Sequence, residues 1–164
     1  MTQEDLYVKI VVDAWNDQIK FTNKIFDQLT DEQLMNEVAP SKNRGIYLLG
    51  HLVAVHDRML PLLRFGDELY PELFPVFVQV PDKTVANLPT IEQLKEQWQI
   101  VNQKLADHIN NLPAAEWFTR HANVSEEDFA KEPHRNRLNV LISRTNHLSN
   151  HRGQIALLLP KTQE

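Results

Sequence analysis

The stretch RTNHLSNHRGQ, residues 144–154, places two histidines four residues apart, His147 and His151. Apolar residues such as Val140 and Leu158 flank it at helical spacing, so one helix is predicted here. Both imidazoles then project from one side of the helix, a turn apart, and interrupt the stripe that faces the core. Buried ring nitrogens need partners, and a shared metal ion would satisfy both rings. The plain alternative is two core histidines that each hold an ordinary hydrogen bond.

Three more amphipathic segments precede this one, each with apolar residues at a period of about 3.6. The four expected helices cover about residues 3–29, 43–64, 90–112 and 137–159. The strings TDEQ and TIEQ, which begin at Thr30 and Thr90, have the form of capping boxes and mark helix starts. The sequence therefore predicts an all-α fold, namely an antiparallel four-helix bundle with a long connection between its second and third helices.

That long connection, about residues 65–89, contains four prolines and is not expected to form a regular helix. Leu73, Phe74 and Phe77 within it are apolar enough to pack over another part of the molecule. A long aromatic connection in a helical domain is often a lid or a cavity wall. Plain surface packing is the other interpretation, and the pattern does not separate the two.

The composition narrows the class of protein. The length of 164 residues suits a single domain over 1–164, with 42% hydrophobic and 24% charged residues. A net charge of -5 and the lack of a basic run disfavour a nucleic-acid or anionic-membrane partner. The N-terminus does not have the basic-then-apolar form of a signal peptide, so a cytoplasmic protein is expected. Since there is no cysteine, histidine and carboxylate are the expected metal ligands.

Two histidines leave a metal ion short of ligands, so a third is expected from another helix. The second helix offers His51 and His56, which diverge by roughly 140° on a regular helix and cannot both bind the ion. Periodicity does not choose between them. His108, near the end of the third helix, is expected to be a favourable end charge. His121 and His134 lie in polar surroundings and are expected to be solvated.

Other chemistries lack their motifs in this chain. No histidine follows a glutamate by three positions, as a di-iron bundle requires, and no H-E-x-x-H string of a zinc protease occurs. Dinucleotide and phosphate-binding glycine motifs are also absent. Three imidazoles with an open fourth position are typical of a catalytic metal site, with zinc or nickel as the expected ion.

The strings GHL at 50–52 and HLSNHRGQ at 147–154 resemble the DinB family of metalloenzymes, and the helix order extends the resemblance over nearly the whole chain. The resemblance implies a dimeric four-helix bundle with a divalent metal held by His51, His147 and His151. Family members with an assigned activity are transferases and isomerases that use bacillithiol, mycothiol or similar thiols. We therefore expect a metal-dependent S-transferase, isomerase or hydrolase that acts on a small electrophile with a low-molecular-weight thiol.

The alternative function is a non-catalytic dimeric helical module with a structural metal or a bound small ligand. A fourth protein ligand, for instance Asp13 or Asp57, would favour this module, whereas an open position would favour the enzyme. Within the motif, Gln154 is expected to orient a ligand imidazole. Arg152 is expected to meet a neighbouring helix, a dimer partner or a carboxylate. The cost of Gly153 inside a helix suggests a close helix approach there.

Overall fold

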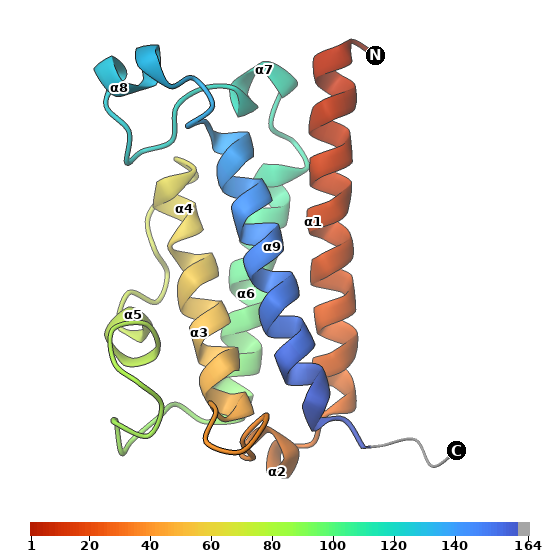
Figure 1. Cartoon of the computed structure of the whole chain (residues 1–164), viewed down its shortest axis with the longest axis vertical. Coiled ribbons are helices and arrows are strands. Elements are labelled where there is room, and N and C mark those ends of the chain that lie inside the picture. The colour runs from red at the N-terminus through yellow and green to blue at the C-terminus, as the bar shows by residue number, and fades with distance from the viewer. Residues whose placement is uncertain (161–164) are drawn as a thin grey trace.

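The computed structural model describes residues 1–160, which form helices and connecting segments without a β-strand (Figure 1). The all-α expectation is therefore confirmed for this part of the chain. The helices are α1 (Gln3–Gln28), α2 (Asp31–Leu34), α3 (Gly45–Asp57), α4 (Met59–Leu62), α5 (Leu73–Phe77), α6 (Ile91–Ile109), α7 (Ala114–Trp117), α8 (Glu126–Lys131) and α9 (Arg137–Ile155), with a 3-10 turn η1 (Ala156–Leu158).

The long helices α1, α6 and α9 and the α3–α4 pair lie side by side along the length of the molecule (Figure 1). Helix α1 packs on α9, and α3 packs on α6, α5 and α9. Helices α1 and α9 run in one direction, while α3 and α6 run in the other (Figure 1). The expected antiparallel bundle is therefore not confirmed, because the consecutive long helices α3 and α6 run in the same direction. The connection after α4 returns the chain to the level where α3 begins, so α6 starts there and runs parallel to α3.

Side-chain caps set the starts of the helices, as the sequence indicated at two of them. Thr30 and Thr90 each accept a hydrogen bond from the third helical residue, whose own side chain bonds back, so both predicted capping boxes are confirmed. Thr2 forms a third capping box at the start of α1. Asn136 caps α9 by accepting a bond from Asn139 N at 2.9 Å. These caps satisfy backbone N–H groups that have no partner inside the helix.

Helix α3 is the centre of the core. Every residue of α3 except His51 is buried, which is the behaviour of a helix that is apolar on all sides. The second helix expected over 43–64 is divided, because α3 ends at Asp57 and α4 contains Pro61. Proline lacks the N–H that would bond back into α3, so the helix breaks there. The Asp57 carboxylate then accepts bonds from Leu69 N and Tyr70 N and holds the connection against the break.

Helix α5 shows that the proline-rich connection covers part of the core. Pro75 is tolerated because it lies in the first turn of this short helix, where its missing N–H has no helical partner. Phe77 is fully buried against α3 at Gly50, where a Cβ atom would overlap with the phenyl ring. Gly50 therefore permits a close approach of the two helices that no larger residue would allow.

Among the described residues, no helix has both the length and the apolar character needed to cross a bilayer.

The expectation of a close helix approach at Gly153 is wrong. A Cβ atom added to Gly153 would meet no other atom within 4 Å, and the residue is exposed. The glycine costs helix stability without allowing any packing in return.

We predict that Gly153→Ala raises the free energy of unfolding by about 1 kcal/mol, because alanine loses less backbone entropy in a helix interior. Urea denaturation of the metal-free protein, followed by circular dichroism, measures the change. The same substitution at Gly50 is the matched control and should destabilise the protein, since its Cβ has no space. A loss of stability at position 153 would contradict the prediction.

Candidate metal centre

Three imidazoles from two helices converge on one point. His51 comes from α3, and His147 and His151 come from α9, where they are one turn apart. The Nε2 atom of His147 lies 3.2 Å from Nε2 of His51 and 3.1 Å from Nε2 of His151. One ring nitrogen from each of the three lies within 4.8 Å of the others. The antiparallel crossing of α3 and α9 is what brings residues almost a hundred positions apart to this point.

The orientation of His51 depends on α5. Its Nδ1 lies 2.9 Å from the carbonyl oxygen of Phe77. Since a carbonyl only accepts, Nδ1 carries the proton and donates it, which leaves a lone pair on Nε2. The Phe77 ring is in turn seated on Gly50, so the residue before His51 helps to place the acceptor of its hydrogen bond. The Tyr47 ring is stacked nearly parallel to the His51 ring, with 6.5 Å between the ring centroids.

Gln154 has the corresponding role at His151, where the sequence suggested it. Its Oε1 lies 3.0 Å from His151 Nδ1, and its Nε2 donates to Asn150 Oδ1 at 3.3 Å. The amide oxygen therefore accepts from Nδ1–H, and the lone pair of His151 also lies on Nε2. His147 has no such partner, because its Nδ1 is buried and forms no hydrogen bond to any described residue.

This donor set fits a divalent metal ion. Nitrogens bound to a tetrahedral zinc ion at about 2.0–2.1 Å lie about 3.3 Å apart, close to the two separations found here. Burial lowers the pKa of His51, and it lowers the pKa of His147 to about 4, so both rings are neutral near pH 7, the form that binds metals. Hydrogen bonds from the far ring nitrogen of His51 and of His151 are the support that metal-binding histidines usually have.

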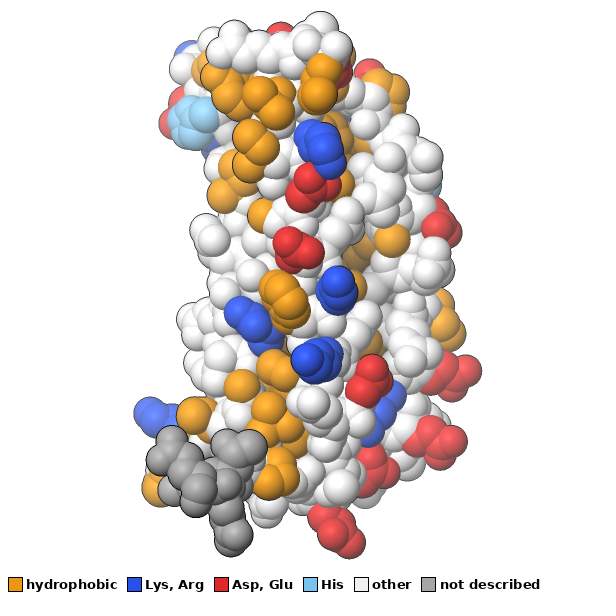
Figure 2. Space-filling view, turned by 90° about the vertical axis from the view of Figure 1, so that its right-hand side faces the viewer, with side chains coloured by type: hydrophobic (Ala, Val, Ile, Leu, Met, Phe, Trp, Pro, Cys, Tyr) orange, Lys and Arg blue, Asp and Glu red, His pale blue; other side chains and the backbone are white. Residues whose placement is uncertain are grey.

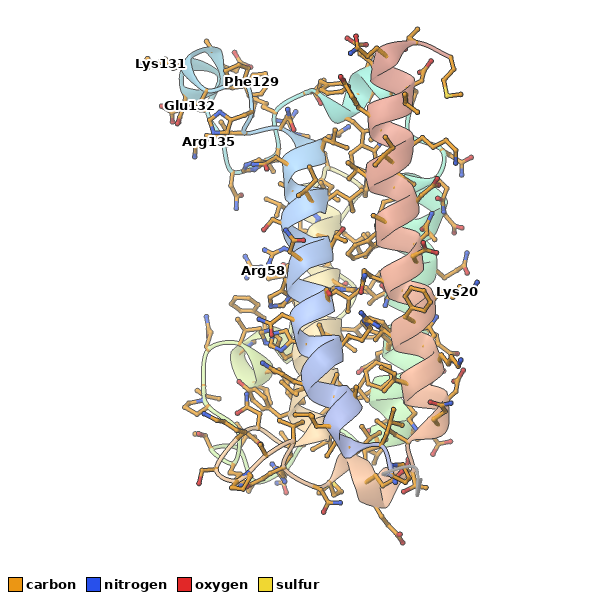
Figure 3. The ribbon with its side chains drawn as sticks, turned by 45° about the vertical axis from the view of Figure 1, so that its right-hand side comes forward. Lys20, Arg58, Phe129, Lys131, Glu132 and Arg135 are labelled. Carbon is orange, nitrogen blue, oxygen red and sulfur yellow. The ribbon has the colours of Figure 1, made fainter. Side chains whose placement is uncertain are left out.

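One side of the histidine cluster opens into a cavity of about 580 Å³. His51 and His147 form part of its wall, together with side chains of α4, α5, the segment before α8 and Arg144 of α9. Figure 3 shows Arg58 on the side of α9 opposite α1, and this residue lines the same cavity. The connection that contains α5 is therefore a cavity wall, as one of the two sequence interpretations had it.

No carboxylate joins the cluster within residues 1–160. Asp57 is buried but accepts two backbone N–H groups of the following connection, and Asp13 pairs with Lys9 on the surface of α1. The two aspartates that would have supplied a fourth ligand are thus engaged elsewhere.

His56, the rival of His51, faces away from the cluster and is fully buried. Its Nδ1 lies 2.8 Å from Asn102 Oδ1, and its ring packs between Trp15 and Trp98. Asn102 donates its amide N–H to the Trp98 carbonyl, so its oxygen is free to accept from His56. Burial lowers the pKa of His56 to about 3, and the side chain is a neutral part of the core.

The remaining histidines lie away from the cluster. His108 stacks on Phe65 with 4.8 Å between the ring centroids, an arrangement that the expected end-charge role did not include. His134 is exposed, and His121 is partly buried and accepts a bond from Asn123 N. Arg152 meets a neighbouring helix, one of the three expected alternatives, with its guanidinium 5.5 Å from the centre of the Phe21 ring of α1.

Sequence reasoning missed two groups at this site. The Phe77 carbonyl gave no signal, because every residue has a backbone carbonyl and the residue type does not show which one accepts this hydrogen bond. Arg144 stood at the start of the quoted stretch, three positions before His147, and this helical spacing was a signal that it lies on nearly the same face.

Fold and site together define an all-helical protein with a candidate three-histidine metal centre beside an open cavity. The family model of the DinB superfamily matches residues 14–155, and the chain therefore belongs to this superfamily. A crystal structure described as that of "the conserved protein of locus from Enterococcus faecalis" is similar to it, with a TM-score of 0.62 and 14% identity over 92% of this chain and 95% of that chain. At this identity the similarity supports the fold alone. No curated protein matches the chain.

We predict that His56 makes the protein acid-sensitive. Its pKa is about 3 when folded and about 6.5 when unfolded, so below pH 6.5 the unfolded chain binds the extra proton and folding stability falls as the pH is lowered. Between pH 7 and pH 5 this loss is about 2 kcal/mol. Chemical denaturation at several pH values, with a chelator present, measures it.

The matched variant is His56→Gln, which removes this titration and keeps the other histidines and all carboxylates. The stability of the variant should fall about 2 kcal/mol less than that of the wild type over the same pH interval. Parallel curves for the two proteins would contradict the assignment.

Proposed function

We propose that the protein is a metal-dependent enzyme of the DinB type, built on a four-helix bundle. His51, His147 and His151 hold one divalent ion, zinc or nickel, and the substrate enters through the cavity beside them. The observation that carries this proposal is the combination of three convergent imidazoles, no carboxylate ligand among residues 1–160, and a cavity of about 580 Å³ at the cluster. A structural site would be closed by a fourth protein ligand.

A zinc or nickel ion bound there would act as a Lewis acid and lower the pKa of a bound water or thiol. The chain itself contributes position and environment. Phe77 O and Gln154 hold the His51 and His151 rings, and the buried surroundings keep His51 and His147 unprotonated. Phe74, Val78 and the aliphatic part of Arg58 give the cavity a partly apolar wall that excludes water from a bound substrate.

The reaction that this site supports best is attack of a thiol or water on a small electrophile, as an S-transferase, isomerase or hydrolase performs it. The chain has no cysteine, so a sulfur nucleophile would be a low-molecular-weight thiol co-substrate. We place the reaction in the cytoplasm, where such thiols are kept reduced. The rival function, a non-catalytic module, is less well supported because the cavity leaves one side of the cluster accessible.

We predict about one divalent ion per chain in protein purified without a nickel column and then incubated with zinc. His51→Ala should remove most of the binding, because two imidazoles on one helix do not hold the ion firmly. Gln154→Leu should weaken affinity by about 10-fold, since His151 loses its orienting acceptor. Elemental analysis and competition with a zinc-binding dye measure the two quantities. The exposed His134→Gln is the control and should bind as the wild type does.

Binding of less than about a tenth of an ion per chain would overturn the metal site. A thermal shift with EDTA separates the two functions. Little loss of stability supports a catalytic ion, whereas a large loss would indicate a structural one.

We also propose that the protein is a homodimer. Leu6, Ile10 and Phe21 of α1 are 45%, 57% and 45% exposed and lie on one face of the helix. Figure 2 shows the side of the molecule on which α1 lies, where hydrophobic side chains alternate with acidic and basic ones. Exposed apolar side chains on one helix face can be buried between two subunits, with the charged side chains around them at the rim of the contact.

We predict that Ile10→Glu shifts a dimer toward monomer in sedimentation equilibrium, because a charge would have to be buried at the contact. Gln3→Glu, on an exposed part of the same helix, is the control and should leave the mass unchanged. A wild-type protein that sediments as a monomer at all concentrations would exclude the dimer.

A further inference from the structure

Arg144 is a half-buried cation without an anionic partner. It lies on α9 one turn before His147 and lines the same cavity as His51 and His147. Its guanidinium forms no hydrogen bond and no ion pair with any of the residues 1–160. A guanidinium has five N–H donors, and withdrawing them from water without a partner is unfavourable.

Two buried or partly buried arginines have carboxylate partners, whereas Arg152, half-buried like Arg144, has none within residues 1–160 and lies over the Phe21 ring instead. Arg44 pairs with Asp82 at 2.6 Å, and Arg137 lies 3.4 Å from Glu116. Arg58, on the opposite wall of the cavity, lies 3.5 Å from Glu68 and covers the Phe74 ring. The pKa of Arg144 is lowered by burial, and no acidic group raises it in compensation. Of these arginines, Arg144 is the one that both lacks a carboxylate partner within residues 1–160 and lines the cavity beside the candidate metal ligands.

We propose that Arg144 binds a carboxylate group of the substrate, and that the protein therefore acts on a small carboxylic acid. The planar guanidinium matches a planar carboxylate with two parallel hydrogen bonds. A single unpaired cation suits a single negative charge. A doubly charged phosphate would need more donors and would meet Glu68 in the same cavity.

The distance between the two attachment points limits the size of the ligand. Residues three apart on a helix have Cβ atoms about 5–6 Å apart, so the carboxylate at Arg144 and the group that reaches the histidines are separated by a few bonds. A molecule with a thiol and a carboxylate at the ends of a short carbon chain has this form. The two-point attachment rests on the proposed metal function, whereas the carboxylate contact at Arg144 does not.

The first experiment uses zinc-loaded protein and two probes of equal length, 3-mercaptopropionate and the neutral 3-mercapto-1-propanol. Calorimetry should show that the carboxylate binds about 10- to 100-fold more tightly, as expected for charge-assisted hydrogen bonds. Arg144→Gln should abolish this preference and leave the affinity for the alcohol and the zinc content unchanged. Arg152→Gln is the matched control, since Arg152 is on the same helix but faces Phe21. Equal affinities in the wild type, or a preference that survives Arg144→Gln, would overturn the proposal.

The second experiment does not require the metal. Propionate and 1-propanol are titrated into metal-free, ¹⁵N-labelled protein, and the arginine Nε–H signal missing from the Arg144→Gln spectrum is followed. Propionate should shift this signal and 1-propanol should not. Absence of a shift would overturn the carboxylate site even if zinc binds. A shift with sulfate as large as with propionate would also overturn it, because it would show a general anion site. If zinc does not bind but propionate shifts the signal, the metal function fails and the carboxylate site stands.

Discussion

The burial of α3 on all sides is the constraint on which the rest of the structure depends. A helix with apolar residues around its whole circumference needs cover from every direction, and α6, α9 and the connection with α5 provide it. His51 is the one residue of this helix that is not buried, and it lies where α5 and α9 meet the helix. The position of the candidate metal centre is therefore a consequence of how the core is closed.

The close contact at Gly50 links this packing to the chemistry. Phe77 fills the space that the missing Cβ leaves, and the same residue supplies the carbonyl that fixes the His51 ring. The proline-rich connection, which carries few helical signals, thus acts on the ligand set through one backbone oxygen. It also forms a wall of the cavity through Phe74 and Val78. The connection that contains α5 therefore both forms part of the cavity wall and orients the His51 ring.

Burial has opposite consequences for the neutral and the charged groups of the molecule. For His51, His56 and His147 it favours the neutral ring, which suits either a core hydrogen bond or a metal ligand. Which of the two roles a buried histidine has depends on the group that its ring nitrogens face. His56 has the Asn102 amide, whereas the Nε2 atom of His147 lies within hydrogen-bond distance only of the Nε2 atoms of His51 and His151 among residues 1–160. Arg144 does not become neutral at any accessible pH, so its partly buried charge is stabilised only when an anion binds beside it.

By itself, the sequence determined the four amphipathic helical segments, the caps at Thr30 and Thr90, and the pairing of His147 with His151, because these depend on residues within a few turns of one another. The family pattern indicated His51, which periodicity could not separate from His56 on a helix that is apolar all round. Only the tertiary structure decided the parallel course of α3 and α6, the empty surroundings of Gly153, and the partners of Phe77 O and Asn102. The physical reason is that these features depend on how distant segments pack, which local spacing does not encode.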